Sequence, residues 1–170
     1  FVEQTEQLGT GHAVMMADKS LADFRGDVLI LCGDVPLLSA DTVRKLHDEH
    51  KATGAAATVL TAVLDDAGKY GRMLRDERGN ICGIVEYKDA NEEQRKIGEF
   101  NTGIYCFDKA MLFDALSRIS NDNEQHEYYL TDTLSILYHA GEKVSNVILE
   151  DLMEVSGVNS QEQLAQLEDV

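Results

Sequence analysis

The stretch DVLILCGD, residues 27–34, decides the fold class of this chain. It is a short apolar run that a glycine and an aspartate end, and such a run predicts a strand buried on both faces, as in a parallel sheet. A helix pattern follows, from Ser39, which can cap the helix, to Gly54, which can end it. Residues 57–63 (ATVLTAV) predict a second strand. The order is therefore strand, helix, strand.

The rest of the chain continues this alternation and adds one hairpin. Residues 73–87 predict two short strands joined by a turn at Arg78-Gly79-Asn80. Alternating strands and helices with an inserted hairpin predict an α/β fold with a mostly parallel sheet. Ligands bind such sheets beyond the carboxyl ends of the strands. Further strands are expected at 100–107 and 144–149, and further helices at 108–119, at 131–140 and from Ser160 onward.

Composition limits the class of protein. The 170 residues suit one domain, and 44% of them are hydrophobic, too many for a disordered chain. The formal net charge is −16, which disfavours nucleic acid and anionic membranes as partners, and no apolar run is long enough to span a bilayer. The three cysteines lack CxxC or Cys/His spacing, so a disulfide scaffold and structural zinc are not expected. A reducing cytoplasm fits best.

Several polar positions are candidates for chemistry. Asp34 follows the first strand, where a carboxylate suits a metal or phosphate-linked site, or else stabilises the turn before the only proline. Residues 9–11 (GTG) let a ring or a phosphate approach the backbone, or else simply start a helix. Asn101 stands in a mostly apolar strand, and a buried amide needs partners. His47 and His50 share a helix face and could share a metal, but without a third ligand we interpret them as surface or boundary residues.

Seven motifs follow one another along the chain, and their order is more specific than any one of them. In this order, the series resembles the uridyltransferase domain of the bacterial bifunctional N-acetylglucosamine-1-phosphate uridyltransferase/glucosamine-1-phosphate acetyltransferase family. The motifs are Gln4 with LGTGHA at 8–13, GDVPL at 33–37, YGR at 70–72, IVEYKDA at 84–90, NTGI at 101–104, EYYLTD at 127–132 and GVN at 157–159.

The resemblance implies a role for individual residues. Asp34 would be the catalytic aspartate that binds Mg²⁺, with Asn159 as its partner ligand. Cys32 stands beside this pair where many family members have tyrosine, which puts one sugar contact in question. The implied substrate-binding residues are Gln4, Gly9 and Thr10 for uracil, Gly71, Glu86 and Asn101 for N-acetylglucosamine, Thr131 for the sugar-phosphate end, and Cys32 and Gly33 next to the metal.

The resemblance also implies the reaction and the architecture. The expected reaction joins UTP and N-acetylglucosamine-1-phosphate to form UDP-N-acetylglucosamine and pyrophosphate. The expected fold is the Rossmann-like nucleotide-diphospho-sugar transferase fold, with residues 1–170 as a partial domain that lacks its first βα unit and glycine-rich loop. A β-helix acetyltransferase domain would follow and form a homotrimer, and the isolated chain is expected to be nearly inactive. The alternatives are a transferase for another sugar-1-phosphate and nucleotide, or a non-catalytic nucleotide-sugar-binding module.

Overall fold

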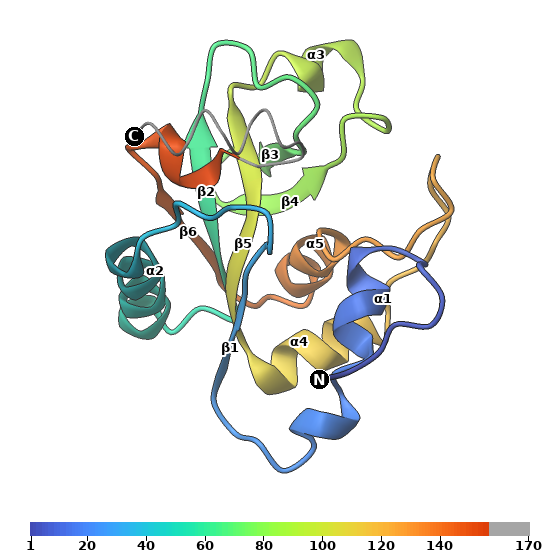
Figure 1. Cartoon of the computed structure of the whole chain (residues 1–170). Helices are drawn as coiled ribbons and strands as arrows, with labels where there is room; N and C mark the ends of the chain where they lie inside the picture. The colour runs from blue at the N-terminus through green and yellow to red at the C-terminus, as the bar shows by residue number, and fades with distance from the viewer. Residues whose placement is uncertain (157–170) are drawn as a thin grey trace.

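The computed structural model describes residues 1–156, which form one sheet with helices on both faces (Figure 1). Along the sheet the order is β4-β3-β5-β2-β6, and β1 pairs with β5 next to β3. The strands are β1 (Asp27–Ile30), β2 (Ala57–Val63), β3 (Arg72–Arg75), β4 (Ile81–Val85), β5 (Glu99–Asp108) and β6 (Val144–Ile148).

The sheet is mixed rather than mostly parallel in its hydrogen bonding. β5 runs antiparallel to β1, β2 and β3, and β3 runs antiparallel to β4. Within the described part of the chain, β2 and β6 form the one parallel pair. Four strands, β1, β2, β3 and β6, nevertheless share one direction, with β5 reversed among them. Apolar runs indicate burial but carry no information on direction, so the α/β class was predictable and the β5 reversal was not.

β1 differs from its prediction in length and in burial. The strand ends at Ile30, two residues before the end of the apolar run at Cys32. Leu29 is 40% exposed and Leu31 48% exposed, so the strand is not buried on both faces. Among residues 1–156, β1 also has a ladder with β5 alone.

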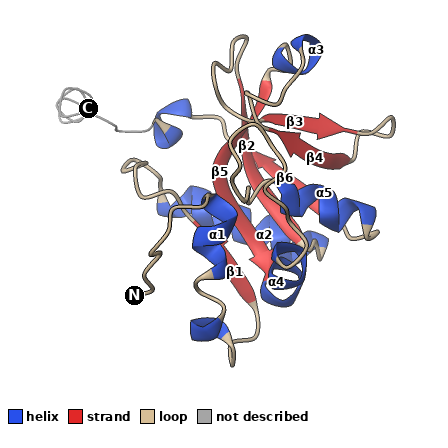
Figure 2. Cartoon of the chain, turned by 90° about the vertical axis from the view of Figure 1, so that its right-hand side faces the viewer, coloured by secondary structure: helices blue, strands red, loops and turns tan. Residues whose placement is uncertain are grey.

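Two helical layers cover the sheet, as the two views show (Figures 1 and 2). On one face Tyr105 and Phe107 of β5 belong to a core shared with α4 and α5. On the other face Ile104 and Cys106 belong to a second core, which contains Leu46 of α2. Neighbouring residues of a strand point to opposite faces, so β5 supplies both cores. The helices are α1 (Thr10–Met15), α2 (Ala40–Thr53), α3 (Glu92–Arg95), α4 (Lys109–Leu116) and α5 (Asp132–His139), with 3-10 turns η1 (Lys19–Leu21) and η2 (Leu152–Val155).

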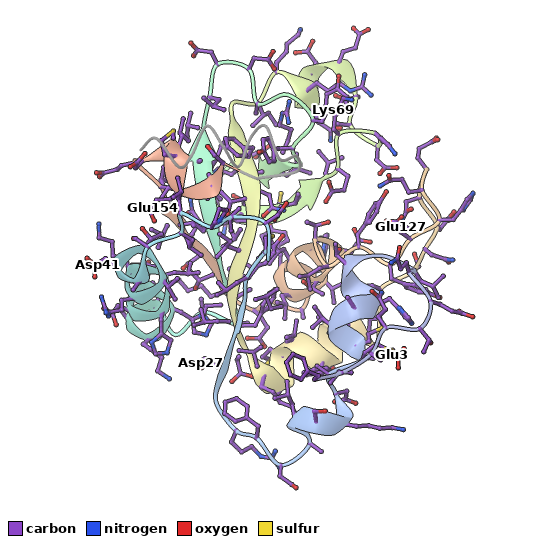
Figure 3. The ribbon with its side chains drawn as sticks, viewed as in Figure 1. Glu3, Asp27, Asp41, Lys69, Glu127 and Glu154 are labelled. Carbon is purple, nitrogen blue, oxygen red and sulfur yellow. The ribbon has the colours of Figure 1, made fainter. Side chains whose placement is uncertain are left out.

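The ends of α2 confirm the predicted caps. The Ser39 hydroxyl accepts a hydrogen bond from the Thr42 amide at 3.1 Å. Gly54 ends the helix in the left-handed conformation at φ 59°, which glycine adopts without strain. Glu154 of η2 lies at the N-terminal end of α2 (Figure 3) and accepts from the Ser39 amide at 2.9 Å. A carboxylate at this position also interacts favourably with the positive N-terminal end of the helix dipole.

The hairpin turn is also as predicted, and Asp76 organises it. Its carboxylate accepts hydrogen bonds from the amides of Arg78 and Asn80 at 2.9 and 2.8 Å. The Asn80 side chain and the Tyr138 hydroxyl of α5 donate to the other oxygen, each at 2.9 Å. These donors, with Asn80 first, lower the pKa of Asp76 to about 2. The turn is thereby tied to α5.

One predicted helix falls outside the described residues, and one observed helix was not predicted. α3 was not predicted, although Asn91 and Gln94 form a reciprocal capping box at its start. The predicted helix from Ser160 lies outside the described residues. Between residues 1 and 156, no helix combines the length and the apolar character that crossing a bilayer requires.

Candidate functional site

A cavity of about 380 Å³ lies between α1, the end of β1, β5 and the start of α5. Five of the residues predicted to bind substrate line it, and they come from five separate segments of the chain. Because the segments are far apart in sequence, only the fold brings them together. The five residues are Thr10, Cys32, Glu86, Asn101 and Thr131.

Glu86 and Thr131 form a hydrogen-bonded polar pair in the wall of the cavity. The buried Thr131 hydroxyl donates a hydrogen bond of 2.9 Å to Glu86 Oε1. Burial raises the pKa of Glu86, the Thr131 hydrogen bond opposes that rise, and the nearby Asp132 and Asp89 carboxylates add to it. The Glu86 carboxyl is thus a poorly solvated group that gains from any further donor, such as a sugar hydroxyl.

Asn101 lines the cavity and is held by backbone contacts of both its side chain and its main chain. Its Oδ1 accepts from the Gly103 amide at 2.9 Å, and Gly103 adopts φ 83°, which a residue with a side chain rarely does. The backbone N–H of Asn101 in turn donates to the Gly71 carbonyl oxygen at 2.9 Å. A Cβ on Gly71 would lie 3.2 Å from Glu86 Oε2. Gly71 therefore packs between Asn101 and Glu86, and its role in binding the sugar stays a prediction.

The segment predicted to hold a base is a loop tied to the residues before α5. Gly9 has φ 108°, and a Cβ there would lie 2.7 Å from the Tyr128 carbonyl oxygen. The Leu130 amide donates to the Thr10 hydroxyl at 3.0 Å. Gln4 Nε2 lies 3.3 Å from the Gly9 carbonyl oxygen, to which it donates, and 3.0 Å from His12 Nδ1. The structure thus brings Gln4, Gly9 and Thr10 together.

The predicted metal position is described only in part. Asp34 is exposed beyond the end of β1, next to the exposed Gly33. The Cys32 thiol donates to the Gly103 carbonyl oxygen at 3.4 Å, and burial raises its pKa, with the Asp34 carboxylate adding to the rise. An exposed carboxylate oxygen is the kind of donor that Mg²⁺ takes from proteins, so Asp34 fits this ion. Asn159 lies outside the described residues.

Tyr105 is a lining residue that the sequence interpretation missed. It is buried, and burial raises its pKa, the Glu86 carboxylate adding to the rise and a hydrogen bond with the Asn101 side chain opposing it. Its phenol is thus held by the Asn101 side chain, in the electrostatic field of Glu86. Residues four apart in a strand share a face, so the pairing of Asn101 with Tyr105 could have been noticed in the sequence.

Comparison with known proteins identifies the family. Residues 1–156 match the protein family described as Nucleotidyl transferase. The chain belongs to this family. The resemblance found from the motif series and the α/β fold class are both confirmed.

The nucleotidyl transferase relatives in the curated collection are longer than this chain. It is 53% identical over 165 residues to the "Bifunctional protein GlmU" of Pelotomaculum thermopropionicum, covering 97% of the chain and 36% of that protein. It is 52% identical over 166 residues to the same-named protein of Syntrophotalea carbinolica, again covering 36% of it. The chain therefore spans about a third of the length of the relatives it matches.

Solved structures show that the fold is shared more widely. The nucleoside-diphosphate-sugar pyrophosphorylase of Vibrio cholerae RC9 superposes with a TM-score of 0.71 at 15% identity, over 99% of this chain and 68% of that one. A UDP-glucose pyrophosphorylase complexed with UDP-glucose gives a TM-score of 0.68 at 14% identity, over 99% of this chain and 66% of that one. At these identities the likeness shows the fold alone.

Proposed function

We propose that the protein containing this chain is a uridyltransferase that joins UTP and N-acetylglucosamine-1-phosphate, releasing pyrophosphate. The observation that carries this proposal is the convergence of Thr10, Cys32, Glu86, Asn101 and Thr131 on one cavity. The similarity to proteins named "Bifunctional protein GlmU" supports the same choice of reaction.

The chemistry of the cavity suits a neutral sugar. Glu86 is the one charged side chain among its described lining residues, and the other polar groups are hydroxyls, an amide and a thiol. A volume of about 380 Å³ is within the usual range for small-molecule sites. Sugar hydroxyls can donate to Glu86 and exchange hydrogen bonds with Asn101 and Thr131. Ala13, Val14 and Leu130 add apolar surface for a ring face or an acetamido methyl group.

The reaction needs positioning more than acid or base. A phosphate oxygen of the sugar phosphate attacks the α-phosphorus of the nucleotide in line, and pyrophosphate leaves. Because that oxygen is already anionic at neutral pH, no strong general base is required. Glu86 and Asn101 would hold the sugar, and Thr131 would contact its phosphate end. Asp34, with Asn159 as proposed partner, would hold Mg²⁺, which supplies charge neutralisation at the phosphates.

The test separates sugar recognition from nucleotide recognition in the full-length protein. Asn101→Ala should raise KM for N-acetylglucosamine-1-phosphate about tenfold or more while leaving KM for UTP within about twofold, since one good hydrogen bond is worth roughly 1–2 kcal/mol. Asn121→Ala, at an exposed asparagine of the loop before α5, is the matched control and should change neither.

Three outcomes distinguish the proposal from its alternatives. Faster turnover of glucose-1-phosphate, or of another nucleoside triphosphate, would assign a different sugar-nucleotide transferase. Calorimetric binding of UDP-N-acetylglucosamine without any turnover would assign a non-catalytic module. Equal KM values for the sugar phosphate in Asn101→Ala and the control would place the sugar elsewhere.

A further inference from the structure

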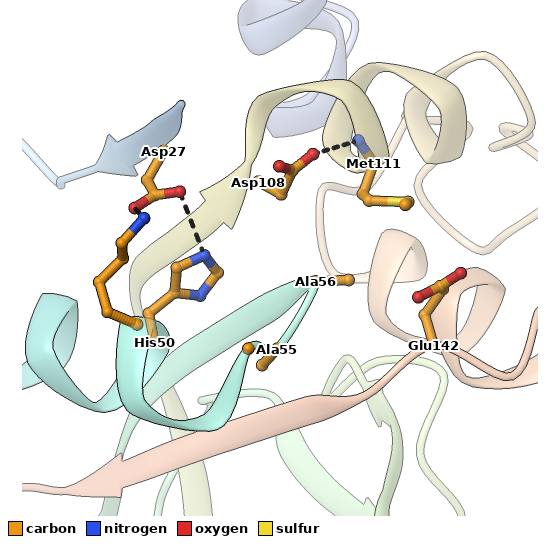
Figure 4. Close-up of a pocket in the computed structure, with 9 residues that line it drawn as sticks. Asp27, His50, Ala55, Ala56, Asp108, Met111 and Glu142 are labelled. Atoms are coloured by element: carbon orange, nitrogen blue, oxygen red, sulfur yellow. Dashed lines mark hydrogen bonds and ion pairs between the residues drawn. The ribbon is translucent and has the colours of Figure 1, made fainter. Parts of the chain in front are cut away.

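On the α2 face of the sheet, away from the substrate cavity, three metal-ligating side chains meet. Asp27 begins β1, His50 lies in the last turn of α2 and Cys106 lies in β5. One ligand atom from each lies within 4.8 Å of the other two. His50 Nε2 is 3.7 Å from Asp27 Oδ1, and Figure 4 shows the two side chains pointing toward one another. His50 is 3% exposed and Cys106 is fully buried, which corrects the interpretation of His50 as a surface or boundary residue.

Strand register explains why these side chains share a face. Cys106 is opposite Leu29 in β1 and opposite Thr58 in β2. Asp27 is two residues from Leu29 and therefore points to the same face as Cys106. Tyr105, the preceding residue, points to the other face and lines the substrate cavity. The cluster is thus separate from the proposed sugar site.

A further hydrogen bond orients the His50 ring toward Asp27. His50 Nδ1 is 2.9 Å from Thr58 Oγ1, which is in turn 3.2 Å from Ser145 Oγ. With Nδ1 as the donor, Nε2 presents its lone pair to the Asp27 carboxylate, and a cation between them would satisfy both acceptors. A ligating histidine typically has its second nitrogen fixed by such a hydrogen bond. Burial also lowers the pKa of His50 and keeps the ring in its neutral, metal-binding form.

We propose that Asp27, His50 and Cys106 form a binding site for a borderline-soft divalent transition cation, with Zn²⁺ as the first choice. The set of one carboxylate, one imidazole and one thiolate matches the ligands of Zn²⁺ and differs from the all-oxygen sets of Mg²⁺. In tetrahedral Zn²⁺ sites the ligand atoms are about 3–4 Å apart, so this cluster needs to contract by about 1 Å. The nearest fourth donor is His47, whose Nε2 is 3.1 Å from Asp27 Oδ2.

The Lys51 ammonium group forms an ion pair with Asp27 at the exposed side of the cluster. Its Nζ is 3.1 Å from Asp27 Oδ2, and its side chain is 61% exposed, so it can swing into solvent. A cavity of about 240 Å³ lined by Asp27, His50 and Lys51 provides the way in. Binding also displaces the thiol proton of Cys106 to solvent, and burial raises the pKa of this thiol to about 12. The cation must displace both the Lys51 ammonium group and this proton, and each displacement lowers the affinity for the metal.

The experiment is a titration of the full-length protein with Co²⁺, a spectroscopic substitute for Zn²⁺. A bound thiolate gives an intense near-ultraviolet sulfur-to-cobalt charge-transfer band, which a cation held only by oxygen, as at Asp34, does not give. The band should appear in the parent protein, vanish in Cys106→Ser and persist in Cys82→Ser, a half-buried cysteine of β4 that serves as the matched control. Excess Zn²⁺ should abolish the band by displacement.

A second variant keeps the test informative if Cys106→Ser does not fold. Lys51→Ala changes a mostly exposed residue, and removing a competing cation should tighten Co²⁺ binding about twofold to fivefold, the range of an exposed ion pair. A merely structural role for Lys51 would give unchanged or weaker binding. Absence of the band in the parent protein, its survival in a folded Cys106→Ser, or weaker binding in Lys51→Ala would each overturn the site.

Discussion

The hydrogen bond from Thr131 to Glu86 offers a quantitative test of the cavity. Thr131→Val keeps the shape of the side chain and removes only the hydroxyl, which donates a hydrogen bond of 2.9 Å to Glu86 Oε1. A hydrogen bond to a charged group contributes about 1.5–3 kcal/mol. Glu86 is only half-buried and water can replace part of that bond, so we expect a loss of about 1.5 kcal/mol in the free energy of unfolding.

A double-mutant cycle assigns that loss to the pair. Urea unfolding of Thr131→Val, Glu86→Leu, which removes both acceptor oxygens, and the double variant should give a coupling energy of about 1 kcal/mol or more. Thr133→Val is the control, because Thr133 is a buried threonine of the first turn of α5 whose hydroxyl donates to the Leu130 carbonyl at 2.6 Å. Its effect should add to that of Glu86→Leu within about 0.5 kcal/mol. A coupling of the Thr131 pair below that limit would refute the reasoning.

Three further predictions follow from the same contacts. Asp34→Ala should nearly abolish turnover of the full-length protein, and unchanged turnover and metal dependence in that variant would remove Asp34 from the mechanism. The pKa of Glu86 in the folded protein is raised above its ordinary value of 4.5, so protonation of Glu86 stabilises the fold. This stabilisation is fully present below pH 4.5 and is lost as the pH rises through the folded pKa. Glu86→Gln should therefore gain stability relative to the parent as pH increases above 4.5 in urea titrations; a pH-independent difference would contradict the shift. The buried Arg72 donates to four backbone carbonyl oxygens, so Arg72→Met should cost about 2–4 kcal/mol in urea unfolding, whereas Lys69→Met, at a neighbouring exposed position, should stay within about 0.5 kcal/mol.

Features that depend on local sequence could be predicted from it. The caps of α2 at Ser39 and Gly54 and the turn around Gly79 are set by residues a few positions apart, and all were correct. β2 was predicted with its exact bounds, because an apolar run between turn signals is also a local pattern. The direction of β5 was not predictable, because it depends on the strands between which β5 lies in the sheet.

The candidate site, too, has residues that could be predicted from the sequence and residues that could not. The motif series located Glu86, Asn101 and Thr131, which the structure brings to one cavity. Tyr105 was missed because it belongs to no motif, although it lines the cavity and its phenol is hydrogen-bonded to the Asn101 side chain. The partnership of Asp34 and Asn159 remains a prediction, because Asn159 lies outside the described residues.

The environment of His50 shows most clearly what a sequence conceals. From the sequence its nearest possible metal ligand was His47, one helical turn away, and no third donor was in view. In the structure the third and fourth donors, Asp27 and Cys106, come from two paired strands beneath α2.

β5 connects the two sites, because Tyr105 and Cys106 are adjacent residues that face opposite sides of the sheet. Tyr105 contributes to the substrate cavity, and Cys106 contributes to the cluster with Asp27 and His50. β1 touches both sites as well, since it begins at Asp27 and leads directly into the segment that carries Asp34. In the described residues that strand is held by a single ladder, so whatever binds Asp27 to β5 and α2 also restrains the segment that presents Asp34. The placement of Asp34, the proposed catalytic residue, therefore depends on contacts on the α2 face of the sheet as much as on the cavity that we propose for the sugar.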